Sequence, residues 1–217
     1  MTRPVQNPAR RGLTLFETAI GSALFAIGLL AAFQTVGRTT HAYESSSSRV
    51  VAEARLIAAL ERVQEILDSV IGDSLPLDSG DVLGSSNLTF REMIGADSGV
   101  AQEGPLMRLF SRLEPSEVPN GLDDDGDGLV DELELVFVRD ADAGFPEEIL
   151  LGGLRPLAAG ELPDLIDNDN DGLIDEPGFV IRREADSLRI HLSAQGSARA
   201  EDIPFDIGIE GRVRLRN

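Results

Sequence analysis

Hydrophobic and polar positions divide the chain into an apolar run, an amphipathic stretch and a mixed remainder. The apolar run covers residues 13–36, and Glu17 is its only charged residue. At about 1.5 Å per residue, a helix of this length is roughly 36 Å long and can cross a hydrocarbon core of about 30 Å. Arginines precede the run and no acid does. This charge asymmetry predicts a cytoplasmic amino terminus and a translocated remainder.

The amphipathic stretch, residues 37–71, predicts a stem helix. Its apolar residues recur at spacings of three and four, which is typical of a helix with one buried face. The expected buried positions are Val50, Ala54, Ile57, Leu60, Val63 or Gln64, Leu67 and Ile71. Gly37 and the serines at 45–48 interrupt the path from the apolar run to the stem, so a flexible or partly melted stretch is expected there.

The mixed remainder, residues 72–217, predicts one extracytoplasmic β-rich domain. A short strand is expected at residues 88–90, and strand signals dominate from residue 133 onward. The expected later strands are 133–139, 148–151, 179–183, 188–192 and 203–215. The predicted fold class is α+β, with one long amino-terminal helix packed on an antiparallel β-sheet.

An internal repeat carries the clearest candidate chemistry. Residues 119–132 align with residues 163–176 without a gap, at an offset of 44 residues. Each copy has carboxylates at loop positions 1, 3 and 5 and a glycine at position 6. Such side chains converge on one point, and the glycine permits the sharp turn. Oxygen donors without histidine or cysteine favour calcium over zinc.

We therefore expect two structural Ca²⁺ sites, one in the loop 123–134 and one in the loop 167–178. The expected ligands of the first are Asp123, Asp125, Asp127, the carbonyl of Leu129, Asp131 and Glu134. Those of the second are Asp167, Asp169, Asp171, the carbonyl of Leu173, Asp175 and Glu176.

These loops resemble the calcium-binding turns of EF-hand, dockerin and thrombospondin type 3 repeats. They depart from the EF-hand at position 12, which is Glu134 in the first loop and Gly178 in the second. The second site must recruit another acid, either Glu176 or Asp164, or bind calcium more weakly. Strand-like flanks and Pro177 argue against flanking EF helices.

The amino-terminal sequence Gly12-Leu13-Thr14-Leu15-Phe16-Glu17 resembles the processing site of type IV pilins and pseudopilins. The resemblance implies cleavage by a prepilin peptidase between Gly12 and Leu13, which removes a leader of residues 1–12. It also implies methylation of the new amino group and pairing of Glu17 with a neighbouring subunit. The departure is Leu13 in place of the usual phenylalanine. The ending at residues 212–217 resembles that of J-type minor pseudopilins.

Composition narrows the function classes. The formal net charge of −19 disfavours nucleic acid as a partner, and the absence of cysteine excludes disulfides and thiol chemistry. No nucleophile elbow, phosphate loop or metal-ligand histidine spacing accompanies His41 or His191. We therefore expect a protein that is not an enzyme.

Taken with the resemblance, these features predict a minor pseudopilin of a type II secretion system. It would be a single-pass protein of the bacterial inner membrane with a periplasmic domain, and then part of a periplasmic or surface filament. Its expected partners are the prepilin peptidase, other pilins or pseudopilins, the inner membrane and exported proteins. The alternatives are a minor pilin of a type IV pilus and a membrane-anchored, calcium-dependent adhesin.

Overall fold

The computed structural model describes residues 14–70, 75–77, 83–97, 100–170, 172–197 and 205–215. The chain forms two compact units, Met1–Glu44 and Ser45–Asn217. The predicted processing residues Gly12 and Leu13, the predicted stem position Ile71 and the predicted ligand Asp171 lie outside the described residues.

A single helix, α1 (Leu15–Asp68), contains both the apolar run and the stem. It begins with a capping box. The hydroxyl of Thr14 accepts from the N–H of Glu17 at 3.2 Å, and the carboxylate of Glu17 accepts from the N–H of Thr14 at 2.9 Å. These bonds satisfy two donors that would otherwise lack partners at the helix start.

The expected interruption between the apolar run and the stem does not occur, because α1 continues through Gly37 and the serine run. Hydroxyl groups in this stretch bond to carbonyls one turn earlier, as Thr39 does to Thr35 and Thr40 to Val36. Polar side chains satisfied in this way are compatible with a helix interior.

The amino-terminal part of α1 is long and apolar enough to cross a membrane. It is the one helix in the described part of the chain that meets this criterion, and none of its most apolar window is buried in the protein. Large apolar side chains such as Leu24, Phe25 and Phe33 are exposed. An apolar helix with no protein around it needs a membrane or other apolar partners to cover it.

The stem end of α1 packs on the sheet, but through a face rotated from the predicted one. Its buried residues are Leu56, Ala59, Val63, Ile66 and Leu67. Val63 and Leu67 were predicted, whereas Ile57 is 49% exposed and Val50 is 61% exposed. Two apolar stripes overlap in this sequence, and the position of the sheet selects between them.

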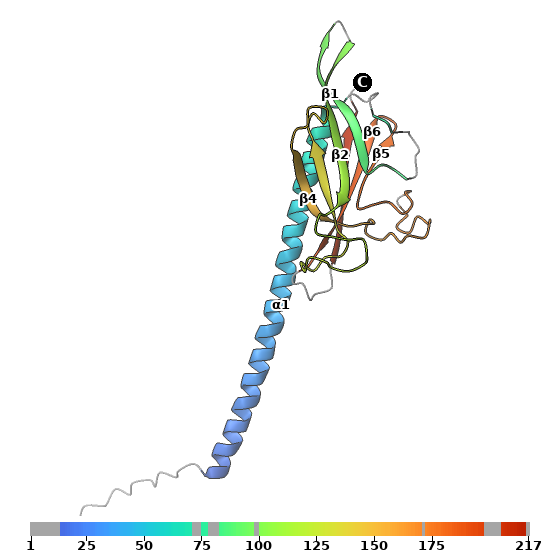
Figure 1. The fold of residues 1–217 in the computed structure, drawn as a ribbon. Coiled ribbons are helices and arrows are strands. Elements are labelled where there is room, and N and C mark those ends of the chain that lie inside the picture. Colours follow the sequence, from blue (N-terminus) through green and yellow to red (C-terminus); the bar gives the residue numbers. More distant parts are fainter. Residues whose placement is uncertain are drawn as a thin grey trace, which may run out of the picture. The chain divides into compact units, whose positions relative to one another are not determined.

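In the part of the chain that the structure describes, seven strands form one antiparallel sheet (Figure 1). They are β1 (Asn87–Asp97), β2 (Val100–Leu113), β3 (Leu133–Val138), β4 (Glu147–Leu154), β5 (Phe179–Glu184), β6 (Ser187–Gly196) and β7 (Phe205–Arg214). The strand order is β1-β2-β3-β4-β6-β5, and β7 also pairs with β6. The stem of α1 packs on this curled sheet through a shared hydrophobic core, which confirms the predicted α+β class and the helix-on-sheet arrangement.

The strand β2 was not predicted, since residues 100–113 contain Gly104 and Pro105. The structure accommodates both next to register shifts in the β1–β2 pairing, between Arg91 and Gly95. Proline lacks the N–H needed in a regular ladder, and an irregular stretch removes that requirement.

The core lies between the stem and one face of the sheet. Alternate residues of β6, namely Leu188, Ile190 and Leu192, are fully buried there. Two long connections extend from the sheet: one joins β2 to β3 and the other joins β4 to β5. They contain the two copies of the repeat, and we call residues 114–132 the first acidic loop and residues 158–176 the second acidic loop.

Candidate metal centre

Both acidic loops are closed at their base by the same backbone hydrogen bond. In the first, the N–H of Glu114 donates to the carbonyl of Glu132 at 3.1 Å. In the second, the N–H of Ala158 donates to the carbonyl of Glu176 at 2.9 Å. The two pairs are related by the 44-residue offset of the repeat, which therefore extends further upstream than the aligned sequences indicated.

A buried glutamate organises the first acidic loop from inside. Glu117 is 5% exposed. One of its carboxylate oxygens accepts from the N–H of Asp124 and the other from the N–H of Asp131, both at 3.2 Å. Hydrogen bonds from the backbone to this carboxylate fix the conformation of the loop.

The second acidic loop repeats this arrangement. Glu161 is 3% exposed, and its oxygens accept from the N–H groups of Asn168 at 2.9 Å and Asp175 at 3.0 Å.

Both loops also contain a hydrogen bond between an asparagine and an aspartate side chain, and the two residue types exchange positions between the loops. The amide of Asn120 donates to Asp124 at 2.9 Å, and in the second loop the amide of Asn168 donates to Asp164 at 2.9 Å. The exchange preserves the bond, so each loop keeps its geometry although its sequence differs.

Carboxylates gather at three places in the described part of the chain, with ligand oxygens within 4.8 Å of one another. We call Glu117, Asp125 and Glu132 the inner trio, and Asp123, Asp125 and Asp127 the outer trio. The second acidic loop places Glu161, Asp169 and Glu176 together as the inner trio is placed. Oxygens this close can bind one cation together.

Glu132 is the most unusual member of these groups. It is fully buried, and neither carboxylate oxygen has a hydrogen-bond partner within the described residues. The pKa of Glu132 is raised to about 7, mainly by burial and also by the charges of Asp127 and Glu117. At an effective dielectric constant near 20, two charges 4.8 Å apart repel by about 3 kcal/mol. A cation would remove this repulsion and supply the missing partner.

The donor set fits a hard divalent cation. All the converging groups are carboxylates, and no histidine or cysteine belongs to the trios. Such oxygen donors suit calcium, magnesium or manganese better than zinc or copper.

The predicted ligands at positions 1, 3 and 5 of the first loop do come together, as the outer trio. Asp123 also shapes the turn, because its carboxylate accepts from the N–H groups of Gly126 and Gly128 at 2.6 and 2.9 Å. In the second loop Asp167 accepts from the N–H of Gly172 at 3.0 Å. Leu129 and Leu173 follow the respective glycines, and Leu173 is buried.

The aspartates at position 9 hold the entry to each loop. Asp131 accepts from the N–H groups of Asn120 and Gly121 at 2.9 and 2.8 Å. Asp175 accepts from Asp164 and Leu165 in the same way, at 3.2 and 3.0 Å. The structure gives both carboxylates a backbone-binding role outside the three converging groups.

Glu134 lies apart from the loop carboxylates. It is on β3, where its carboxylate pairs with Arg112 at 2.6 Å. Arg112 also pairs with Glu147 at 2.7 Å. The structure therefore groups the predicted position-12 acid with an arginine of β2.

Sequence reasoning missed Glu117, Glu132 and Glu161. Extending the alignment of the repeats two residues upstream of Pro119 pairs Glu117 with Glu161, which was an available signal. Glu132 lies within the aligned copies, opposite Glu176. Nothing in the sequence marked its burial.

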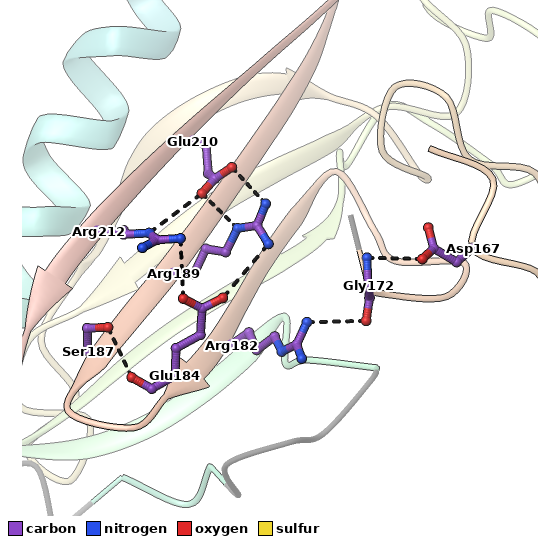
Figure 2. A network of polar contacts seen from close by, with 8 residues as sticks. All are labelled: Asp167, Gly172, Arg182, Glu184, Ser187, Arg189, Glu210 and Arg212. Atoms are coloured by element: carbon purple, nitrogen blue, oxygen red, sulfur yellow. Dashed lines mark hydrogen bonds and ion pairs between the residues drawn. The ribbon is translucent and has the colours of Figure 1, made fainter. Parts of the chain in front are cut away.

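Different side chains tie the two loops to the sheet. Gln195 of β6 bonds to both backbone groups of Val130 in the first acidic loop, at 3.3 and 2.9 Å. Arg182 of β5 donates to the carbonyl of Gly172 in the second acidic loop at 3.2 Å (Figure 2).

Figure 2 also shows a network of ion pairs on the adjacent strands. Arg189 of β6 contacts Glu210 of β7 at 2.7 Å and Glu184 of β5 at 3.8 Å. Arg212 reaches Glu184 at 3.4 Å. The hydrogen bond from Arg189 lowers the pKa of Glu210. Both glutamates of these strands, Glu184 and Glu210, pair with arginines, whereas the carboxylates of each trio lie against one another.

Comparisons with family models, with curated proteins and with solved structures find no match to this chain. What the protein does is therefore inferred from α1 and from the two acidic loops.

Proposed function

We propose that this chain is a minor pseudopilin, a structural subunit of a type II secretion filament with a calcium-stabilised periplasmic domain. The observation that carries the proposal is α1, one uninterrupted helix of 54 residues. Its first part is apolar, exposed and long enough to span a membrane, and its last part is the stem on which the sheet is built. A helix of this kind can be stored in a membrane and then packed against identical helices in a filament.

Glu17 supports the same proposal. A carboxylate in an apolar segment is costly unless it is paired, so it marks a functional contact. In the single chain, Thr14 provides that contact through its N–H and hydroxyl groups, at 2.9 and 3.0 Å. In a filament, the amino group of a neighbouring processed subunit would provide a positive partner and set the register between subunits.

Mass spectrometry of the amino-terminal peptide tests the processing step. The proposal predicts loss of residues 1–12 and a methylated Leu13. An intact terminus beginning at Met1 would contradict both pilin-type functions and favour the membrane-anchored adhesin.

Deletion of the gene separates the two filament systems. Loss of exported proteins from the medium, with surface filaments intact, is expected for a pseudopilin. Loss of surface filaments with secretion intact would contradict the proposal and favour a minor pilin of a type IV pilus.

The calcium part of the proposal rests on the three groups of converging carboxylates. Calcium is abundant outside the cytoplasm, and its binding to the folded state alone would stabilise the domain. The melting temperature of the full chain should therefore rise in calcium relative to chelator. Equal melting temperatures would contradict calcium stabilisation without affecting the filament proposal.

A further inference from the structure

We propose that the inner trio of Glu117, Asp125 and Glu132 is a Ca²⁺ site in its own right, and that it holds the ion of the first acidic loop. This inference builds on the calcium-stabilised domain proposed above and names its ligands. The inner trio is not the ligand set that the 1-3-5 spacing predicts, because Glu117 and Glu132 lie outside residues 123–127.

The burial of the two glutamates distinguishes the inner trio from the outer trio. Glu117 is 5% exposed and Glu132 is fully buried, whereas Asp125 and Asp127 are exposed. An ion at the inner trio would be shielded from water on two sides, and its attraction to the carboxylates would be less screened.

Glu132 supplies an observation independent of the clustering itself. Both of its oxygens lack hydrogen-bond partners within the described residues, although the side chain has no exposed surface. Buried charged groups are paired or bind metal ions. Within the described residues no basic side chain forms an ion pair with Glu117, Asp125 or Glu132, so the partner that fits is a cation.

Glu117 is preorganised for the same ion. Its two oxygens already accept backbone N–H groups, from Asp124 and Asp131, which fix the carboxylate in place. Each carboxylate oxygen has a further lone pair available for coordination. Ligands held in position before binding lose little conformational freedom when the ion arrives.

The inner trio also joins parts of the chain that the outer trio does not. Glu117 is near the start of the first acidic loop, Asp125 is at its tip, and Glu132 immediately precedes β3. The carbonyl of Glu132 is already bonded to Glu114, next to the end of β2. An ion here would cross-link the loop to the sheet, whereas an ion at the outer trio would only close a turn.

The second acidic loop places Glu161, Asp169 and Glu176 in the same relation. The recurrence at the 44-residue offset indicates that the arrangement belongs to the repeated unit. We therefore expect one equivalent ion in each acidic loop. Three carboxylates favour a divalent over a monovalent cation, and an all-oxygen donor set suits Ca²⁺.

Calorimetric titration of the metal-stripped full chain in detergent with CaCl₂ tests the proposal. Wild type should bind two equivalents. Glu132→Gln keeps the side-chain shape, removes the charge and should lose one equivalent. Asp127 belongs only to the outer trio, and Asp127→Ala, which removes both ligand oxygens, should still bind two. Asp142→Asn makes the same charge change on the exposed β3–β4 connection and should match wild type.

Two results would overturn the proposal. One is that Glu132→Gln binds two equivalents as wild type does. The other is that Asp127→Ala loses an equivalent, which places the ion at the outer trio. Because Asp127 is exposed, this variant decides the question even where Glu132→Gln fails to fold. Amino-terminal processing is measured separately, so failure of this site is distinguishable from failure of the pseudopilin proposal.

Discussion

Replacing Glu132 by glutamine should stabilise the calcium-free protein at and above neutral pH. The folded state raises the pKa of Glu132 from 4.5 to about 7, mainly because the carboxyl is buried. Between these values the folded chain holds a proton that the unfolded chain has released. Wild-type stability therefore falls as pH rises through this window. Glutamine does not titrate and is free of this loss.

The size of the effect follows from the pKa difference. The rise of the pKa from 4.5 to about 7 corresponds to about 3 kcal/mol once both states are deprotonated. Working above the isoelectric point of about 4.3 limits precipitation. From pH 5.5 to pH 8, the stability difference between Glu132→Gln and wild type should grow by about 2 kcal/mol. For a chain of this size that is roughly 4–8 °C in melting temperature.

Thermal unfolding followed by far-ultraviolet circular dichroism measures this difference, because the chain has no tryptophan and one tyrosine. The buffers must be stripped of divalent metal, and Asp142→Asn serves as the control for a lost surface charge. Adding calcium should reverse the order, since wild type gains binding energy that Glu132→Gln lacks. If the wild-type and Glu132→Gln curves stay parallel from pH 5.5 to 8 without metal, the electrostatic reasoning is wrong.

Three further predictions concern the frame around the site. Gln195→Leu removes the hydrogen bonds to both backbone groups of Val130. Chemical denaturation should show an unfolding free energy lower by about 2 kcal/mol, and an unchanged value would show that these bonds do not stabilise the fold. Gly178→Ala would place a Cβ against the backbone oxygen of Arg155, so the soluble yield should drop sharply, and a normal yield would contradict this close packing. Leu56→Ala should lower the free energy of unfolding by about 2–5 kcal/mol in thermal melting, and Ile57→Ala by much less, because Leu56 is fully buried and Ile57 is 49% exposed. Equal losses for the two variants would contradict the observed buried face of the helix.

Local patterns were sufficient for the helix, for most strands and for the position of the loops. The spacing of apolar residues in α1, the alternation in β6 and the repeated Asp-rich loops each involve residues close in sequence. Interactions within one turn or one strand largely determine such elements. The capping pair Thr14 and Glu17 is local in the same way.

Other features depended on partners distant in the chain. The stem could have buried the stripe through Ile57 or the one through Leu56, and only contact with the sheet selects the second. The strand β2 contains Pro105 and exists because β1 and β3 pair with it on both sides. Glu134 pairs with Arg112, a choice that the spacing within the loop could not reveal.

The candidate metal centre depends both on local spacing in the sequence and on contacts between residues distant in the chain. The sequence by itself determined that Asp123, Asp125 and Asp127 lie on one tight turn, because their spacing forces them together. Only the tertiary structure decided that Glu117 and Glu132 join Asp125. Their meeting requires the base of the loop to be closed between β2 and β3, and closure buries Glu132, whose carboxylate has no hydrogen-bond partner among the described residues. Burial is a property of the assembled sheet and loop, so no pattern of neighbouring residues encodes it.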